Sequence, residues 1–132
     1  MGTEERNPIP RVTESELKVL QYLWEKSPAG SKQIHEGLED ANWNIQTVKT
    51  LLSRLVDKKA ISYDISGRNY MYYPIVQRDE YVVEESRSLL DKMFHGSLKT
   101  MVLNLVESNM VSDEELDELR RFLDKQGGAD SE

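Results

Sequence analysis

The segment from Asn44 to Val56 contains no acidic residue, although the whole chain of 132 residues carries a formal net charge of −7. Its polar side chains are amides, hydroxyls and cations, which can approach a phosphate group without repulsion. Gln, Lys and Arg are also side chains that read the edges of DNA bases. The chemistry that this segment favours is therefore nucleic-acid recognition. The polar residues concerned are Asn44, Gln46, Thr47, Lys49, Thr50, Ser53 and Arg54.

A helical period separates these polar residues from the apolar residues of the same segment. Val48, Leu51, Leu52 and Leu55 fall on one face of a 3.6-residue helix, and the polar side chains fall on the opposite face or flank it. A solvated helix face that lacks acids by chance would show the same pattern. A basic residue at the tip of a following hairpin, Arg68, favours the DNA interpretation over this alternative.

The elements around this helix follow a recognisable order. Thr13 and Glu16 form a capping-box pattern that opens a first helix, and Ser31 is expected to cap a second. Asn44 is expected to cap the third, and apolar residues then alternate in residues 61–65 and 70–72 around a turn at residues 66–68, which predicts a β-hairpin. The predicted fold is mainly α with a small β-hairpin, a winged helix-turn-helix followed by a C-terminal helical region. In that fold the third helix enters the major groove and the hairpin lies on the DNA backbone.

The C-terminal part of the chain predicts three further amphipathic helices. A capping-box pattern at Ser112 and Glu115 opens the last of them, and Gly127-Gly128 is expected to end it. Helices this short would leave their apolar stripes exposed to solvent in a monomer, so we expect a homodimer interface there. The predicted organisation is a disordered tail (1–10), a winged-helix DNA-binding domain (11–76), a helical dimerisation region (77–126) and a second disordered tail (127–132). The expected dimer contacts are Val82, Leu89, Met101, Leu105, Leu116, Leu119 and Leu123.

Charge and composition narrow the function classes. Residues 1–78 hold eleven Lys/Arg against ten Asp/Glu, whereas residues 79–132 hold six against fourteen, so the acidity belongs to the C-terminal part. The chain has no cysteine, and its two histidines, His35 and His95, have no partner cluster, which disfavours a metal site. Nothing arranges a nucleophile beside a base, so we expect no enzyme and no cofactor. With no signal peptide or membrane span visible, a cytoplasmic location is expected.

Four segments carry a resemblance to a known family. They are TESELKVLQYLW at 13–24, WNIQTVKTLLSRLVDKK at 43–59, YMYYPIV at 70–76 and SLKTMVLNLVE at 97–107. The chain resembles, over about residues 11–125, the penicillinase-repressor family of bacterial winged-helix regulators, the BlaI/MecI type with the copper-responsive CopY repressors as a branch. The resemblance implies a homodimeric repressor that binds double-stranded DNA at a palindromic operator.

Two departures from the family bear on how such a repressor would be released. The copper branch senses metal through a C-terminal cysteine cluster, and the absence of cysteine excludes thiolate sensing here. In the β-lactam branch a regulatory protease pathway cleaves an Asn-Phe bond in the dimerisation region. The corresponding bond in this chain is Asn104-Leu105, which keeps the Asn but not the aromatic residue. The rival interpretation is a winged-helix module that binds another protein and not DNA.

Overall fold

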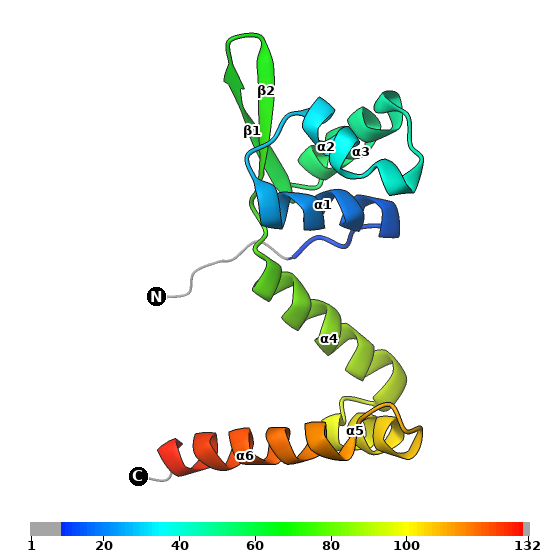
Figure 1. The fold of residues 1–132 in the computed structure, drawn as a ribbon, viewed down its shortest axis with the longest axis vertical. Coiled ribbons are helices and arrows are strands. Elements are labelled where there is room, and N and C mark those ends of the chain that lie inside the picture. Colours follow the sequence, from blue (N-terminus) through cyan, green and yellow to red (C-terminus); the bar gives the residue numbers. More distant parts are fainter. Residues whose placement is uncertain (1–8, 131–132) are drawn as a thin grey trace. The chain divides into compact units, whose positions relative to one another are not determined.

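The computed structural model describes residues 9–130, which form helices and one hairpin in two compact units (Figure 1). The units divide within α4, between residues 85 and 86, and each is described by itself. In chain order the elements are α1 (Glu14–Lys26), α2 (Ser31–Gly37), a 3₁₀ turn (Glu39–Ala41), α3 (Ile45–Asp57), β1 (Ile61–Ser66), β2 (Asn69–Pro74), α4 (Arg78–Phe94), α5 (Leu98–Glu107) and α6 (Asp113–Asp130).

The helix starts of the first unit follow from short-range hydrogen bonds. The capping box predicted at α1 is confirmed, because Thr13 Oγ1 accepts from the Glu16 amide and Glu16 Oε1 accepts from the Thr13 amide. The prediction for α2 was wrong by one residue: Gly30 is the N-cap, and Ser31 is already helical. The side chain of Gln33 accepts from the Gly30 amide at 2.9 Å, so the cap comes from within the helix and needs no hydroxyl at its start.

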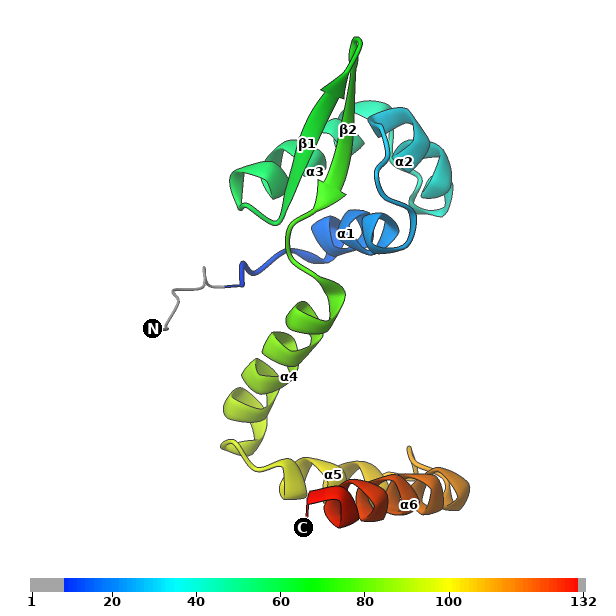
Figure 2. The ribbon, with the colours of Figure 1, turned by 90° about the vertical axis from the view of Figure 1, so that its left-hand side faces the viewer.

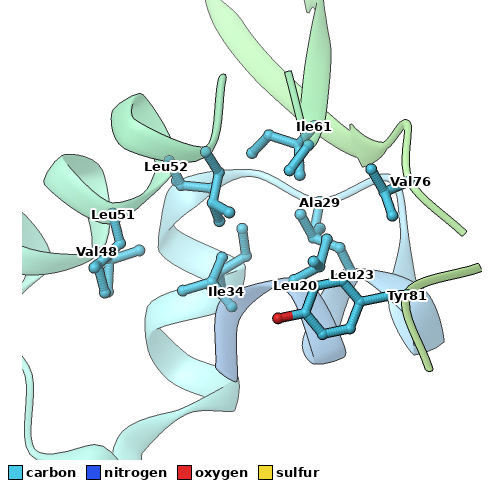
Figure 3. Packing of buried hydrophobic residues seen from close by; sticks show 13 residues of the cluster. Leu20, Leu23, Ala29, Ile34, Val48, Leu51, Leu52, Ile61, Val76 and Tyr81 are labelled. Atoms are coloured by element: carbon cyan, nitrogen blue, oxygen red, sulfur yellow. The ribbon is translucent and has the colours of Figure 1, made fainter. Parts of the chain in front are cut away.

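The core of this unit lies between the three helices and the base of the hairpin (Figure 3). Leu20 and Leu23 from α1 meet Ile34 from α2 and Leu52 from α3, and all four side chains are fully buried. Ile61 at the start of β1 is also buried and fixes the hairpin to the helices. The apolar face predicted for α3 is confirmed, since all four of its members are buried: Val48, Leu51, Leu52 and Leu55.

The predicted hairpin is confirmed and projects from the helices as a wing (Figure 2). β1 and β2 are antiparallel, in a register that runs from Ile61 opposite Pro74 to Ser66 opposite Asn69. Gly67, in the connecting turn, has a φ of 64°, a conformation that glycine adopts without strain. Ala29, between α1 and α2, adds a backbone bridge that the sequence did not predict, because it exchanges hydrogen bonds of 2.8 and 3.0 Å with Tyr72.

The first turn of α4 belongs to the first unit and packs against α1. Trp24 Nε1 donates to the Val76 carbonyl at 2.8 Å, and the ring of Tyr81 lies 5.8 Å from the Trp24 ring. Tyr81 and Val76 are each only 6% exposed. Three helices, a two-stranded wing and this closing turn make up a winged-helix unit.

The second unit consists of the rest of α4 with α5 and α6, and none of its described side chains, up to residue 127, is buried. The capping box predicted for α6 is confirmed, with 3.1 Å bonds in both directions between Ser112 and Glu115. The expectation that Gly127-Gly128 ends the helix was wrong, since α6 continues to Asp130. Glycine lowers helix propensity by only about 1 kcal/mol relative to alanine, which does not by itself stop a helix of this length.

The two expected tails are covered only in part. Residues 1–8 and 131–132 lie outside the described residues. Ile9 is half-buried and packs against the core, so the chain meets the folded unit before residue 11. In the described part of the chain, no helix combines the length and the apolar character that crossing a bilayer requires.

Candidate nucleic-acid interface

The polar face of α3 is open to solvent on the side opposite the core. Gln46, Lys49, Ser53 and Arg54 are exposed, while Thr47 and Thr50 are half-buried. The apolar face is held between α1 and α2, so the helix cannot turn its polar side inward without losing the core. The result is a rigid helix that presents donors and cations, without an acid, over three turns.

The start of α3 is fixed by Asn44. Its Oδ1 accepts from the Thr47 amide at 2.8 Å and from the Thr47 hydroxyl at 3.1 Å. The predicted cap is confirmed, and it uses the amide oxygen, so the NH₂ group of this exposed residue remains able to donate to a partner. The first turn of α3 contains no acidic residue, so the positive end of the helix dipole is not neutralised from within.

Most of the predicted contact residues gather around one shallow hollow on α3. Its location over the first three turns would let a base edge or a phosphate meet several side chains at once. Ser53 is exposed on the same helix but does not line the hollow. The lining residues are Asn44, Gln46, Thr47, Thr50, Leu51 and Arg54.

A second hollow lies between α2, α3 and the wing. Lys49 of α3 lines this hollow and not the first one. Lys49 and Arg68 both line it, so the structure brings together a cation of α3 and the wing-tip cation. Lys32 of α2 adds a third cation, and no acidic residue is among the lining side chains. Phosphate is the group that three cations around an acid-free hollow can hold. The other lining residues are Gly30, Ser31, Gln33, Asn69, Tyr70, Met71 and Tyr72.

Sequence reasoning missed the contribution of α2 to this surface. Lys32 and Gln33 were assigned no role, because nothing local shows that the start of α2 meets the wing. The contact depends on the Ala29–Tyr72 bridge, which draws the α1–α2 connection against β2. The only signal in the sequence was a basic residue at the start of the second helix of a helix-turn-helix.

Tyrosines stiffen the wing. Tyr63 and Tyr70 stack with ring centroids 4.7 Å apart, and Tyr72 lies 5.7 Å from Tyr63. Burial and the two neighbouring phenols, Tyr63 and Tyr70, raise the pKa of Tyr72 above its ordinary value. Cross-strand aromatic contacts of this kind hold a two-stranded ribbon that would otherwise be marginal. Arg68 is therefore presented at the tip of a braced hairpin.

The residues predicted for dimer contact all lie on α4, α5 and α6. Val82, Leu89, Leu119 and Leu123 are exposed, and Met101, Leu105 and Leu116 are half-buried. Asn104 is exposed within α5, and its carbonyl accepts from the amide and hydroxyl of Ser108 at 3.1 and 2.9 Å. The Asn104-Leu105 bond is thus part of a helix and not of a loop.

Comparison with known proteins gives matches over most of the chain. The family model described as penicillinase repressor matches residues 12–125. A penicillinase repressor of Bacillus licheniformis is 31% identical over 118 residues, which cover 89% of this chain and 92% of the relative. The methicillin resistance regulatory protein MecI of Staphylococcus aureus is 28% identical over 120 residues, 90% of this chain and 98% of MecI.

The fold of the chain is also similar to a solved structure. The solution structure of the DNA-binding domain of the repressor BlaI is 27% identical, with a TM-score of 0.51, and the match covers 58% of this chain and 94% of that domain. The first relative and BlaI are named as repressors, and MecI is named as a regulatory protein. Together with the match of the family model, these likenesses show that the chain belongs to the penicillinase-repressor family.

Proposed function

We propose that this protein is a transcriptional repressor that binds double-stranded DNA as a homodimer at a palindromic operator. The observation that carries the proposal is the acid-free polar face of α3 beside a hollow lined by Lys32, Lys49 and Arg68. Phosphate neutralisation gives affinity for any DNA, and the amide and hydroxyl groups at the start of α3 give sequence preference. The DNA-binding domain of BlaI, to which the first unit is similar, supports this assignment.

The second unit supplies the argument for a dimer. Its helices carry apolar stripes, yet none of its side chains is buried among the described residues 86–127. Leu119, Phe122 and Leu123 of α6 are each about half exposed, which a stable monomer would seldom tolerate as a continuous stripe. A second copy of the chain is the proposed cover. A two-fold dimer matches a palindrome whose half-sites lie about one helical turn, or a multiple of it, apart.

Release from the operator is the third part of the proposal. A regulatory protease that cuts between Asn104 and Leu105 would divide α5 and detach α6 from the winged-helix unit. Proteases bind extended chains, so α5 must first open, and a helix without buried side chains opens at low cost. Loss of the linkage between the two half-site contacts would weaken operator binding by roughly 10²–10⁴-fold.

Selection of bound fragments from genomic DNA tests the function directly. The full chain should enrich palindromic sites, and a gel shift should show tighter binding to these sites than to random DNA of equal length. The rival, a protein-interaction module, predicts no shift with either DNA. A repressor would act where the DNA is, in the cytoplasm of a bacterial cell.

A further inference from the structure

His35 joins α2 to the start of α3 through a hydrogen bond. It is half-buried on α2, and its Nε2 lies 2.8 Å from the carbonyl oxygen of Trp43. A carbonyl only accepts hydrogen bonds, so Nε2 must carry the proton. The bond spans the connection between α2 and α3 and is made to the residue immediately before the N-cap Asn44.

The connection between α2 and α3 contains a residue in an uncommon backbone conformation. Asn42, one residue before Trp43, has a φ of 58°, in the left-handed region. The ring of Trp43 packs against the core, which fixes the side chain but leaves the orientation of its carbonyl to other contacts. The direction of the Trp43 carbonyl sets the peptide plane that leads into Asn44, and Asn44 in turn orients Thr47 through two hydrogen bonds.

We propose that His35 is a positioning residue for DNA readout, because its hydrogen bond to Trp43 sets the orientation of Asn44 and Thr47 at the start of α3. The proposal rests on the proposed function, since it concerns the same DNA-facing surface. His35 does not itself touch DNA. Its effect falls on sequence preference, which needs side chains held within fractions of an ångström, and less on phosphate attraction, which tolerates small shifts.

A pair of amide substitutions separates the hydrogen bond from other effects of the ring. In His35→Gln the side-chain NH₂ reaches about as far as Nε2 and can restore the bond. In His35→Asn the amide is one carbon shorter and cannot reach the Trp43 carbonyl. Both variants replace the ring with a neutral amide, so they differ mainly in this one contact. His95→Asn in the second unit is the matched control, because His95 has a φ of 51° and Asn tolerates that conformation well.

Four quantities are measured on the full chain: affinity for the selected operator, affinity for random DNA, hydrogen exchange of the Thr47 amide without DNA, and the melting temperature. For His35→Asn we expect the operator-to-random ratio to fall about fivefold per half-site, the value of one ordinary hydrogen bond. We also expect faster exchange at Thr47. His35→Gln should restore both values, and His95→Asn should change neither.

The outcomes divide cleanly. An unchanged operator-to-random ratio in His35→Asn, or equal losses in the Asn and Gln variants, would overturn the positioning role. A lowered melting temperature with an unchanged ratio would mean that His35 serves stability alone. If the unsubstituted chain shows no operator preference, the proposed function fails. The Thr47 exchange rate then still decides whether His35 fixes the start of α3.

Discussion

The ammonium group of Lys58, the residue that follows α3, donates a hydrogen bond to the carboxylate of Glu16 in α1. Lys58 Nζ also donates to the Arg11 carbonyl at 3.1 Å. Glu16 is only 1% exposed, and the amide of Thr13 donates to the same carboxylate oxygen. The end of α3 is therefore tied to the start of α1 by an ion pair whose acidic member is buried.

This ion pair predicts a pH dependence of stability. Burial raises the pKa of Glu16, but the hydrogen bonds from Lys58 and Thr13 and the charge of Lys58 outweigh it and hold the pKa below 4.5. The folded state thus binds fewer protons than the unfolded state, so the contribution is present above pH 4.5 and is lost as the pH falls through the lowered pKa. Urea unfolding of the unsubstituted chain and of Glu16→Gln over this pH range checks it. Identical pH profiles for the two proteins would contradict the assignment.

Base readout is expected at the start of α3. Replacing Gln46 or Lys49 with Ala should cost roughly 1–3 kcal/mol at the operator, with a smaller loss on random DNA. Binding titrations on both DNAs measure the difference. Lys49 tests base readout more strictly than Gln46 does, because Lys49 lines the same hollow as Arg68, where a phosphate contact is the alternative. Equal losses on operator and random DNA would make Lys49 a phosphate contact and remove it from base readout.

Phosphate contact is expected for Arg54 and Arg68. Loss of either guanidinium should weaken binding to all sequences alike and reduce the slope of log affinity against log salt by about one unit. Titrations at several salt concentrations give this slope for Arg54→Ala and Arg68→Ala. Arg121→Ala, in the second unit, removes the same charge from a helix without a proposed DNA contact and serves as the control. A slope that stays unchanged in Arg68→Ala would separate the wing tip from the DNA backbone.

Dimerisation is expected to depend on the apolar stripes of α5 and α6. Leu105→Asp or Leu119→Asp places a charge where a second copy would pack, so each variant should be monomeric and bind the operator weakly. Sedimentation at micromolar concentration measures the association. The exposed Ser108→Asp variant controls for added charge on the same unit. A stable monomer for the unsubstituted chain at that concentration would refute the homodimer.

Cleavage is imitated by a fragment of residues 1–104. It retains the whole first unit and lacks α6, so it should bind DNA as a monomer with poor operator preference. Operator titrations beside the full chain, with sedimentation of both proteins, test this. If the fragment binds the operator as tightly as the full chain, disruption of the dimer is not the release mechanism.

The sequence predicted those features that depend on neighbouring residues. The caps at Thr13, Asn44 and Ser112 each need one side chain and one amide three residues away, so their signal is local. The apolar face of α3 and the hairpin were also predicted from patterns that repeat within a few residues, and both elements were confirmed.

Features that depend on distant segments could not be read in this way. The bridge from Ala29 to Tyr72, the bond from His35 to Trp43 and the approach of Lys32 to the wing join residues without a shared periodic pattern. The sequence assigned the polar side chains of α3 to one surface. Their division between two hollows depends on the position of the wing relative to α3.

The closing turn around Tyr81 also determines where members of such a family could exchange their halves. A chain truncated at residue 76 would lose the Tyr81 ring that lies beside Trp24, whereas one truncated at residue 85 would retain it. On the proposed function, the boundary between the DNA-binding unit and the unit proposed to dimerise lies inside α4 and not in a loop. Recombination just after Glu85 would join a new C-terminal unit to an intact winged-helix unit. The inducing signal could then change while the proposed mode of DNA binding stays the same.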